Sequence, residues 1–194
     1  MTLKEITSDK IFTYSNLLSF FRILLAFPII VLLDRIHTDD INRYYVVAIF
    51  FLVFLTDIGD GYLARKLNQV TEFGKIIDPL ADKILAIIII TKLYFLGEIS
   101  TFLLLVIIIR DVLIFIAGVL LSIKIKRVLP SNLLGKATIF TIGLYLILLI
   151  LNIQMLAGIV NILYYLVIIL SFVSLLGYAL RAYETIKWQK NESN

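Results

Sequence analysis

The chain has 194 residues, of which 61% are apolar and 16% charged, and its mean hydropathy is +1.01. A water-soluble domain draws about a quarter of its residues from Asp, Glu, Lys and Arg, so this composition excludes a soluble globule and predicts one membrane domain over residues 1–194. The chain has no Cys and one His, which excludes disulfides and Cys-ligated metals. A net charge of +4 is modest for a nucleic-acid-binding protein and favours contact with anionic lipid head groups.

The N-terminal residues 1–13 mix Leu3 and Ile6 with Lys4 and Glu5. This mixture suits a short amphipathic helix on the inner membrane surface, and a disordered tail is the alternative. The apolar run that follows contains Arg22 and no convincing small-residue cleavage site, so we interpret it as a retained span rather than a signal peptide.

Six apolar runs long enough to cross a bilayer follow one another along the chain. They cover residues 17–33, 44–63, 76–96, 99–123, 133–151 and 156–180. The breaks between them contain charged and turn-forming residues, such as Gly97, Glu98 and Pro130. The sequence therefore predicts an all-α integral membrane protein with six transmembrane helices.

Lys and Arg are distributed unevenly between the two sides that six spans create. Twelve of them lie on the side that holds both termini, and three lie on the other side. Because positively charged loops stay in the cytoplasm, we predict that both termini face the cytoplasm.

Four Asp residues occur in or beside the second and third apolar runs. Asp57 and Asp60 are three apart and Asp78 and Asp82 are four apart, spacings that place each pair on one face of a helix. A short polar break joins the two helices, so both pairs are expected at the same depth, near the cytoplasmic side. Each acid at the centre of a membrane helix costs about 2.5–3.5 kcal/mol. Oxygen-rich clusters without Cys or His bind hard divalent ions such as Mg²⁺, and paired metals serve displacement at phosphorus.

Two other interpretations of these acids stay open. They could be ordinary charges at loop ends, paired with neighbouring cations such as Arg65 and Lys83. They could also carry ions through a cation-coupled transporter, because intramembrane acids often line such paths. The small residues Gly61 and Ala64 favour a ligand site, since they reduce side-chain bulk on the same helix.

This pattern resembles the signature of the CDP-alcohol phosphatidyltransferases, membrane enzymes that make phospholipids. The matching residues, at the family's separations, are Asp57, Asp60, Gly61, Ala64, Arg65, Gly74, Asp78 and Asp82. The segment from Phe73 to Lys83 is most similar to the bacterial phosphatidylglycerophosphate synthase branch of the family. Arg110 followed by Asp111 departs from that branch and is closer to cardiolipin synthases of the same superfamily.

The resemblance implies roles for the four acids. Asp57, Asp60 and Asp78 are expected to bind Mg²⁺ or Mn²⁺, with two ions in each active site. Asp82 completes this metal site and acts as the general base. A base needs a free lone pair within reach of the attacking hydroxyl, and the last acid of the second pair is best placed to keep one.

The resemblance also implies a pocket for the cytidine nucleotide. Its expected residues are Asn16, Arg22, Gly61, Ala64, Arg65 and Gly74. Arg65 could hold the diphosphate with two parallel hydrogen bonds that Lys would not reproduce. Arg65 could instead anchor the end of its span, and Arg22 could extend to the membrane surface.

Three basic residues in or near different spans are candidates for holding the phosphate of the acceptor. They are Arg110, Lys136 and Arg181. Arg110 lies well inside an apolar run, and its alternative is a buried pair with Asp111 or with one of the signature acids. Lys136 and Arg181 have alternatives as loop and helix-end anchors.

The resemblance implies transfer of a phosphatidyl group from CDP-diacylglycerol to a polar alcohol, with release of CMP, in a bacterial cytoplasmic membrane. The active site is expected to face the cytoplasm, and glycerol 3-phosphate is the acceptor that the resemblance favours. Phosphatidylglycerol, giving cardiolipin, and inositol phosphate remain alternatives, as does an inactive scaffold of the same fold. A homodimer is a further expectation from similar enzymes.

Overall fold

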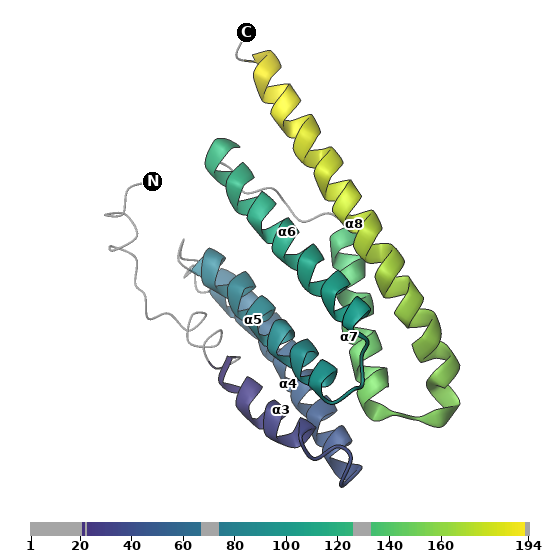
Figure 1. The fold of residues 1–194 in the computed structure, drawn as a ribbon. Helices are drawn as coiled ribbons and strands as arrows, with labels where there is room; N and C mark the ends of the chain where they lie inside the picture. The colour runs from purple at the N-terminus through teal and green to yellow at the C-terminus, as the bar shows by residue number, and fades with distance from the viewer. Residues whose placement is uncertain (1–20, 22, 67–73, 126–132, 193–194) are drawn as a thin grey trace. The chain divides into compact units, whose positions relative to one another are not determined.

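The structure is a computed structural model that describes residues 21, 23–66, 74–125 and 133–192. Within these ranges, side chains are described except at 57–81, 122–125, 186 and 188–192. The described residues form six α-helices and one short 3-10 helix, which confirms the all-α prediction (Figure 1). They are α3 (Ala26–Leu33), α4 (Ile41–Lys66), α5 (Gly74–Phe95), α6 (Thr101–Ile125), α7 (Leu133–Leu151), η1 (Gln154–Leu156) and α8 (Ala157–Glu192).

The chain divides into two compact units, Met1–Ile99 and Ser100–Asn194. The first contains α3, α4 and α5, and the second contains α6, α7, η1 and α8. A single domain over the whole chain stays a prediction.

In the first unit, α3 packs against both α4 and α5. The residues between them are branched aliphatic side chains from all three helices, including Ile29, Leu33, Val46, Ile90 and Leu93, and each is at most 1% exposed. In a membrane, close packing of this kind holds helices together through dispersion contacts rather than through exclusion of water. Helices α4 and α5 run in opposite directions (Figure 1).

The beginning of α3 is set by Pro28, which lies in its first turn. Proline has no N–H to donate to the carbonyl four residues earlier, and the helical turn before Ala26 is interrupted at Leu25. The helix ends at Leu33, where the sequence predicts the end of the first span. Residues 17–20 of that span and the expected amphipathic helix at residues 1–13 lie outside the described residues.

A glycine turn ends α5, as the sequence predicts. Gly97 has a φ of +75°, which favours a residue without a Cβ. Its N–H donates to the carbonyl of Tyr94 at 2.9 Å, and the N–H of Glu98 donates to the carbonyl of Leu93 at 3.0 Å. These two bonds form a Schellman motif, which satisfies carbonyls that the end of a helix would leave without partners.

In the second unit, α8 packs against both α6 and α7, and α6 and α8 run in the same direction while α7 runs in the opposite one (Figure 1). Large apolar side chains cover the outside, for example Phe140 at 72% and Leu176 at 65% exposed. Polar side chains lie inside, including Thr138 at 0% and Ser174 at 1% exposed. A protein in water rarely exposes so many large apolar side chains together, so lipid is the solvent of this unit.

Among the described residues, three helical segments are long and apolar enough to cross a membrane: Thr101–Leu121, Leu133–Leu151 and Gln154–Thr185. The chain is therefore an integral membrane protein, and six spans stay a prediction. Helix α7 has the predicted bounds, whereas α8 continues to Glu192, beyond the predicted end of its apolar run at residue 180.

Candidate functional site

The four signature acids lie on two consecutive helices. Asp57 and Asp60 belong to α4, and Asp78 and Asp82 belong to α5. Because both segments are helical, spacings of three and four residues place each pair on one face, as the sequence predicts.

The two acidic pairs also lie at similar heights along their helices. Residues 67–73 connect the end of α4 to the beginning of α5. At a rise of 1.5 Å per residue, Asp60 lies about 9 Å and Asp78 about 6 Å from the helix ends that this connection joins. Asp57 and Asp82 lie about 14 Å and about 12 Å from the same ends. In two antiparallel helices, these heights would bring Asp60 opposite Asp78, and Asp57 opposite Asp82.

The other signature residues occupy positions close to the acids. Gly61, Ala64 and Arg65 lie in the last two turns of α4, and Gly74 is the first residue of α5. The side chain of Asp82 is exposed. Two further residues expected at the nucleotide, Asn16 and Arg22, lie outside the described residues.

Four carboxylates form a donor set that fits Mg²⁺ or Mn²⁺, because hard divalent ions prefer oxygen ligands. Where side chains are described, no three His, Asp or Glu residues gather into a group that could hold a metal ion. The side chains of Asp57, Asp60 and Asp78 lie outside that set. The acids on α4 and α5 therefore stay the metal site that the sequence predicts.

At the opposite ends of the same helices, acids and cations pair with one another. Arg43, at the beginning of α4, donates to Asp40 at 3.1 Å and lies 4.0 Å from Glu98. Lys92, near the end of α5, forms an ion pair with Asp34. These pairs balance charge locally, so this end of the first unit has the features of a structural cluster.

In the second unit, a buried Arg lies in the middle of the span Thr101–Leu121. Arg110 is 5% exposed; its Nη1 lies 2.5 Å from Oδ1 of Asp111, and its Nε donates to Oγ of Ser174 at 3.1 Å. The predicted alternative of a pair with Asp111 is thus present, and the role of Arg110 at the acceptor stays a prediction. Sequence reasoning missed Ser174, which has no signal beyond being a hydroxyl residue in an apolar run.

The other two cations expected at the acceptor differ from Arg110 in their surroundings. Lys136, in the first turn of α7, and Arg181, in the C-terminal half of α8, both have exposed side chains. Arg110 is therefore the buried member of the three.

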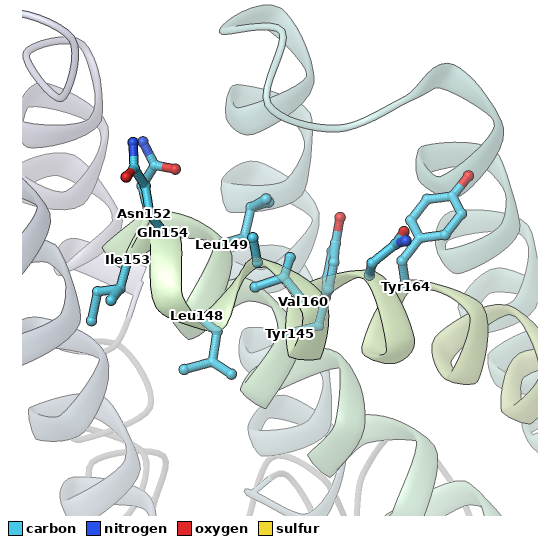
Figure 2. Close-up of a pocket in the computed structure, with 10 residues that line it drawn as sticks. Tyr145, Leu148, Leu149, Asn152, Ile153, Gln154, Val160 and Tyr164 are labelled. Carbon is cyan, nitrogen blue, oxygen red and sulfur yellow. The ribbon is translucent and has the colours of Figure 1, made fainter.

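A cavity of about 440 Å³ lies where α7, η1 and α8 meet (Figure 2). Its ten lining residues are apolar or neutral, with the amides of Asn152 and Gln154 near one end and the rings of Tyr145 and Tyr164 farther along α7 and α8. Recognition of a diphosphate or phosphate relies on cations, helix N-termini or metal ions, and no charged side chain lines this cavity. We therefore do not assign the nucleotide site to it.

The protein is a membrane protein, because its helices are apolar outside and bury polar groups. Two consecutive helices, α4 and α5, each carry a pair of acids, and we call them the acidic helix pair. The family model for CDP-alcohol phosphatidyltransferase matches residues 12–176. The chain belongs to this family and is an enzyme of this class.

Three bacterial relatives are each named CDP-diacylglycerol--glycerol-3-phosphate 3-phosphatidyltransferase. The protein from Aquifex aeolicus is 31% identical over 179 residues, which cover 88% of this chain and 96% of the relative. The protein from Rickettsia bellii is 34% identical over 55% of this chain and 61% of the relative. The protein from Bacillus subtilis is 39% identical over 45% of each chain.

Proposed function

We propose that this enzyme transfers the phosphatidyl group of CDP-diacylglycerol to glycerol 3-phosphate and releases CMP. The observation that carries this proposal is the signature on α4 and α5, with its acids at matching heights on two consecutive helices. The acceptor is favoured by the names of the relatives in Aquifex, Rickettsia and Bacillus.

In this proposal, Asp57, Asp60, Asp78 and Asp82 hold two Mg²⁺ or Mn²⁺ ions between α4 and α5. When bound, such ions neutralise the diphosphate and stabilise the charge that develops at phosphorus. The seven-residue connection 67–73 supports this arrangement, since short connections favour antiparallel neighbouring helices.

Asp82 takes the proton from the acceptor hydroxyl. The hydroxyl oxygen then forms a bond to the phosphorus that carries diacylglycerol, and the bond from that phosphorus to the CMP oxygen breaks. CMP leaves with the electron pair of that bond. The exposed side chain of Asp82 suits this role, because a base must reach a hydroxyl that enters from water.

The nucleotide lies beside Gly61, Ala64 and Gly74, where small side chains leave room, and Arg65 binds the diphosphate with two parallel hydrogen bonds. Asn16 and Arg22 complete this pocket from the N-terminal part of the chain.

The phosphate of glycerol 3-phosphate binds at Arg110, with Lys136 and Arg181 as further cations. A buried Arg in an apolar span supports this assignment, because an ionisable residue at that depth is costly and marks a functional site by default. Both termini and the active site face the cytoplasm in this proposal, as the twelve-to-three distribution of Lys and Arg indicates.

The test is to incubate the purified protein and Mg²⁺ with CDP-diacylglycerol and, separately, glycerol 3-phosphate, phosphatidylglycerol or inositol phosphate. We expect CMP release and a new anionic phospholipid with glycerol 3-phosphate. CMP release with phosphatidylglycerol or inositol phosphate alone would contradict the proposed acceptor. Absence of CMP release with all three, together with ion-driven uptake into vesicles, would contradict the reaction and support a transporter.

A further inference from the structure

The guanidinium group of Arg110 is held in place by contacts at two of its nitrogen atoms. Its Nη1 donates to Asp111, the next residue on α6, and its Nε donates to the hydroxyl of Ser174 on α8. A guanidinium carries five N–H groups in a planar fork, and a phosphate oxygen pair needs two adjacent groups with a fixed orientation. Whatever fixes the plane of this group therefore decides how well it matches a phosphate.

The hydroxyl of Ser174 has a defined direction. Its Oγ donates to the backbone carbonyl of Ser171 at 3.0 Å, one turn earlier on α8. A hydroxyl has a single proton, so the oxygen faces Arg110 as an acceptor. A neutral acceptor orients the guanidinium without cancelling its charge, whereas a second carboxylate would compete with an anionic ligand.

The position of Ser174 opposite Arg110 is set by the whole interface between α6 and α8. The hydroxyls of Ser100 and Tyr164 lie 3.4 Å apart, with the same separation of 64 residues as between Arg110 and Ser174. Two parallel helices thus keep one register over about 15 Å. Farther along α6, a Cβ on Gly118 would lie 3.1 Å from the hydroxyl of Tyr178, so the side chain of Tyr178 on α8 reaches the backbone of α6 there.

Ser171 provides an internal comparison. Both serines are 1% exposed and lie one turn apart on α8. Among the described residues, the hydroxyl of Ser171 is a buried group without a hydrogen-bond partner, whereas that of Ser174 bonds to Arg110. The two residues are both buried serines on the same helix, and they differ in that Ser174 contacts Arg110.

We infer that Ser174 is a positioning residue for the acceptor: it holds the plane of the Arg110 guanidinium so that this group binds the phosphate of the attacking alcohol. This inference rests on the proposed function, in which Arg110 binds that phosphate. It adds a second residue of α8, the helix that also carries Arg181, to those that determine the affinity for the acceptor.

The test compares Ser174→Ala, Ser174→Thr and Ser171→Ala, with CMP release measured against the concentrations of glycerol 3-phosphate and of CDP-diacylglycerol. Loss of this one hydrogen bond should raise the KM for glycerol 3-phosphate about five- to tenfold, the effect of a hydrogen bond of typical strength. We expect kcat and the KM for CDP-diacylglycerol to change less than about twofold, because Ser174 does not touch the donor in this account. Thr should restore the KM, and Ser171→Ala should leave it unchanged.

A double-mutant cycle separates positioning from general packing. In an Arg110→Lys background, the Nε–H donor is gone, so Ser174→Ala should have no further effect on the KM for glycerol 3-phosphate. Wild-type protein that releases CMP, together with a Ser174→Ala variant of unchanged KM, would overturn the positioning role and leave the proposed function standing. A rise in the KM for both substrates, together with a loss of thermal stability, would assign Ser174 to packing alone. Wild-type protein that releases no CMP with glycerol 3-phosphate would overturn the proposed function itself.

Discussion

Both units contain charged residues within apolar helices, but the surroundings of these residues differ. In the first unit, four acids lie within 26 residues (57 to 82) on two consecutive helices, and we propose that bound divalent ions compensate their charge. In the second unit, Arg110 is balanced by its neighbour Asp111 and held by Ser174, 64 residues away. The first arrangement is suited to metal-assisted chemistry, and the second to recognition of an anion.

The largest effect is expected at the first unit. Asp82→Asn keeps the size of the side chain and removes the base, so kcat for CMP release should fall about 10²- to 10⁴-fold while the protein remains folded. Initial rates of CMP release and the melting temperature in detergent measure the two properties. Asp40→Asn makes the same chemical change at the other end of the acidic helix pair, where the side chain is 88% exposed, and should leave kcat within about twofold. Normal turnover by Asp82→Asn would defeat the assignment of the base.

The second effect, at Arg110, is smaller and should concern the acceptor. Arg110→Lys retains the charge and loses the planar fork, so the KM for glycerol 3-phosphate should rise about tenfold or more, with the KM for CDP-diacylglycerol unchanged. The control is Arg35→Lys, at an exposed position in the connection between α3 and α4. An equal rise in both KM values would contradict a role of Arg110 that is specific to the acceptor.

The two helices that carry the signature acids are predictable from the sequence, because the pattern that predicts them is local. The period of a helix is enough to place each pair of acids, three or four residues apart, on one face. The short connection makes the two helices neighbours along the chain. The bounds of α7 follow in the same way from its apolar run, residues 133–151. The contact between Arg110 and Ser174 is not predictable, because the two residues lie on different helices. The apolar runs do not show which residues of α6 lie opposite which residues of α8.

The end of α8 shows a second kind of limit. Hydropathy marks where the bilayer ends, so the apolar run predicts an end at residue 180, whereas the helix reaches Glu192. Residues 181–192 contain no Gly or Pro and include several good helix formers, so the helix continues beyond the apolar part.

A third prediction concerns stability and compares Arg110 with Arg43, which is also buried among the described residues. Arg43 is 6% exposed and pairs with Asp40 and with Glu98, whose side chain is 17% exposed. Arg43→Ala leaves Glu98 without this partner and should lower the free energy of unfolding by about 1–3 kcal/mol. Thermal melting in detergent measures this loss, and both KM values should stay at the wild-type level. A selective rise in the KM for glycerol 3-phosphate would contradict a purely structural role.

The smallest effect is expected at Lys92. Its ion pair with Asp34 joins side chains that are 22% and 55% exposed, so solvent screens much of their attraction. Lys92→Ala should cost less than about 1 kcal/mol of stability. A loss of stability as large as that of Arg43→Ala in the same melting experiment would contradict the expectation that the more exposed ion pair contributes less.

We propose that acids from both α4 and α5 bind the same divalent ions. Binding of Mn²⁺ to the purified protein, followed by electron paramagnetic resonance, tests it without reliance on turnover. We expect Asp60→Asn on α4 and Asp78→Asn on α5 each to weaken Mn²⁺ binding about tenfold or more. Full affinity in either variant, with loss confined to the other helix, would contradict a site shared by the two helices.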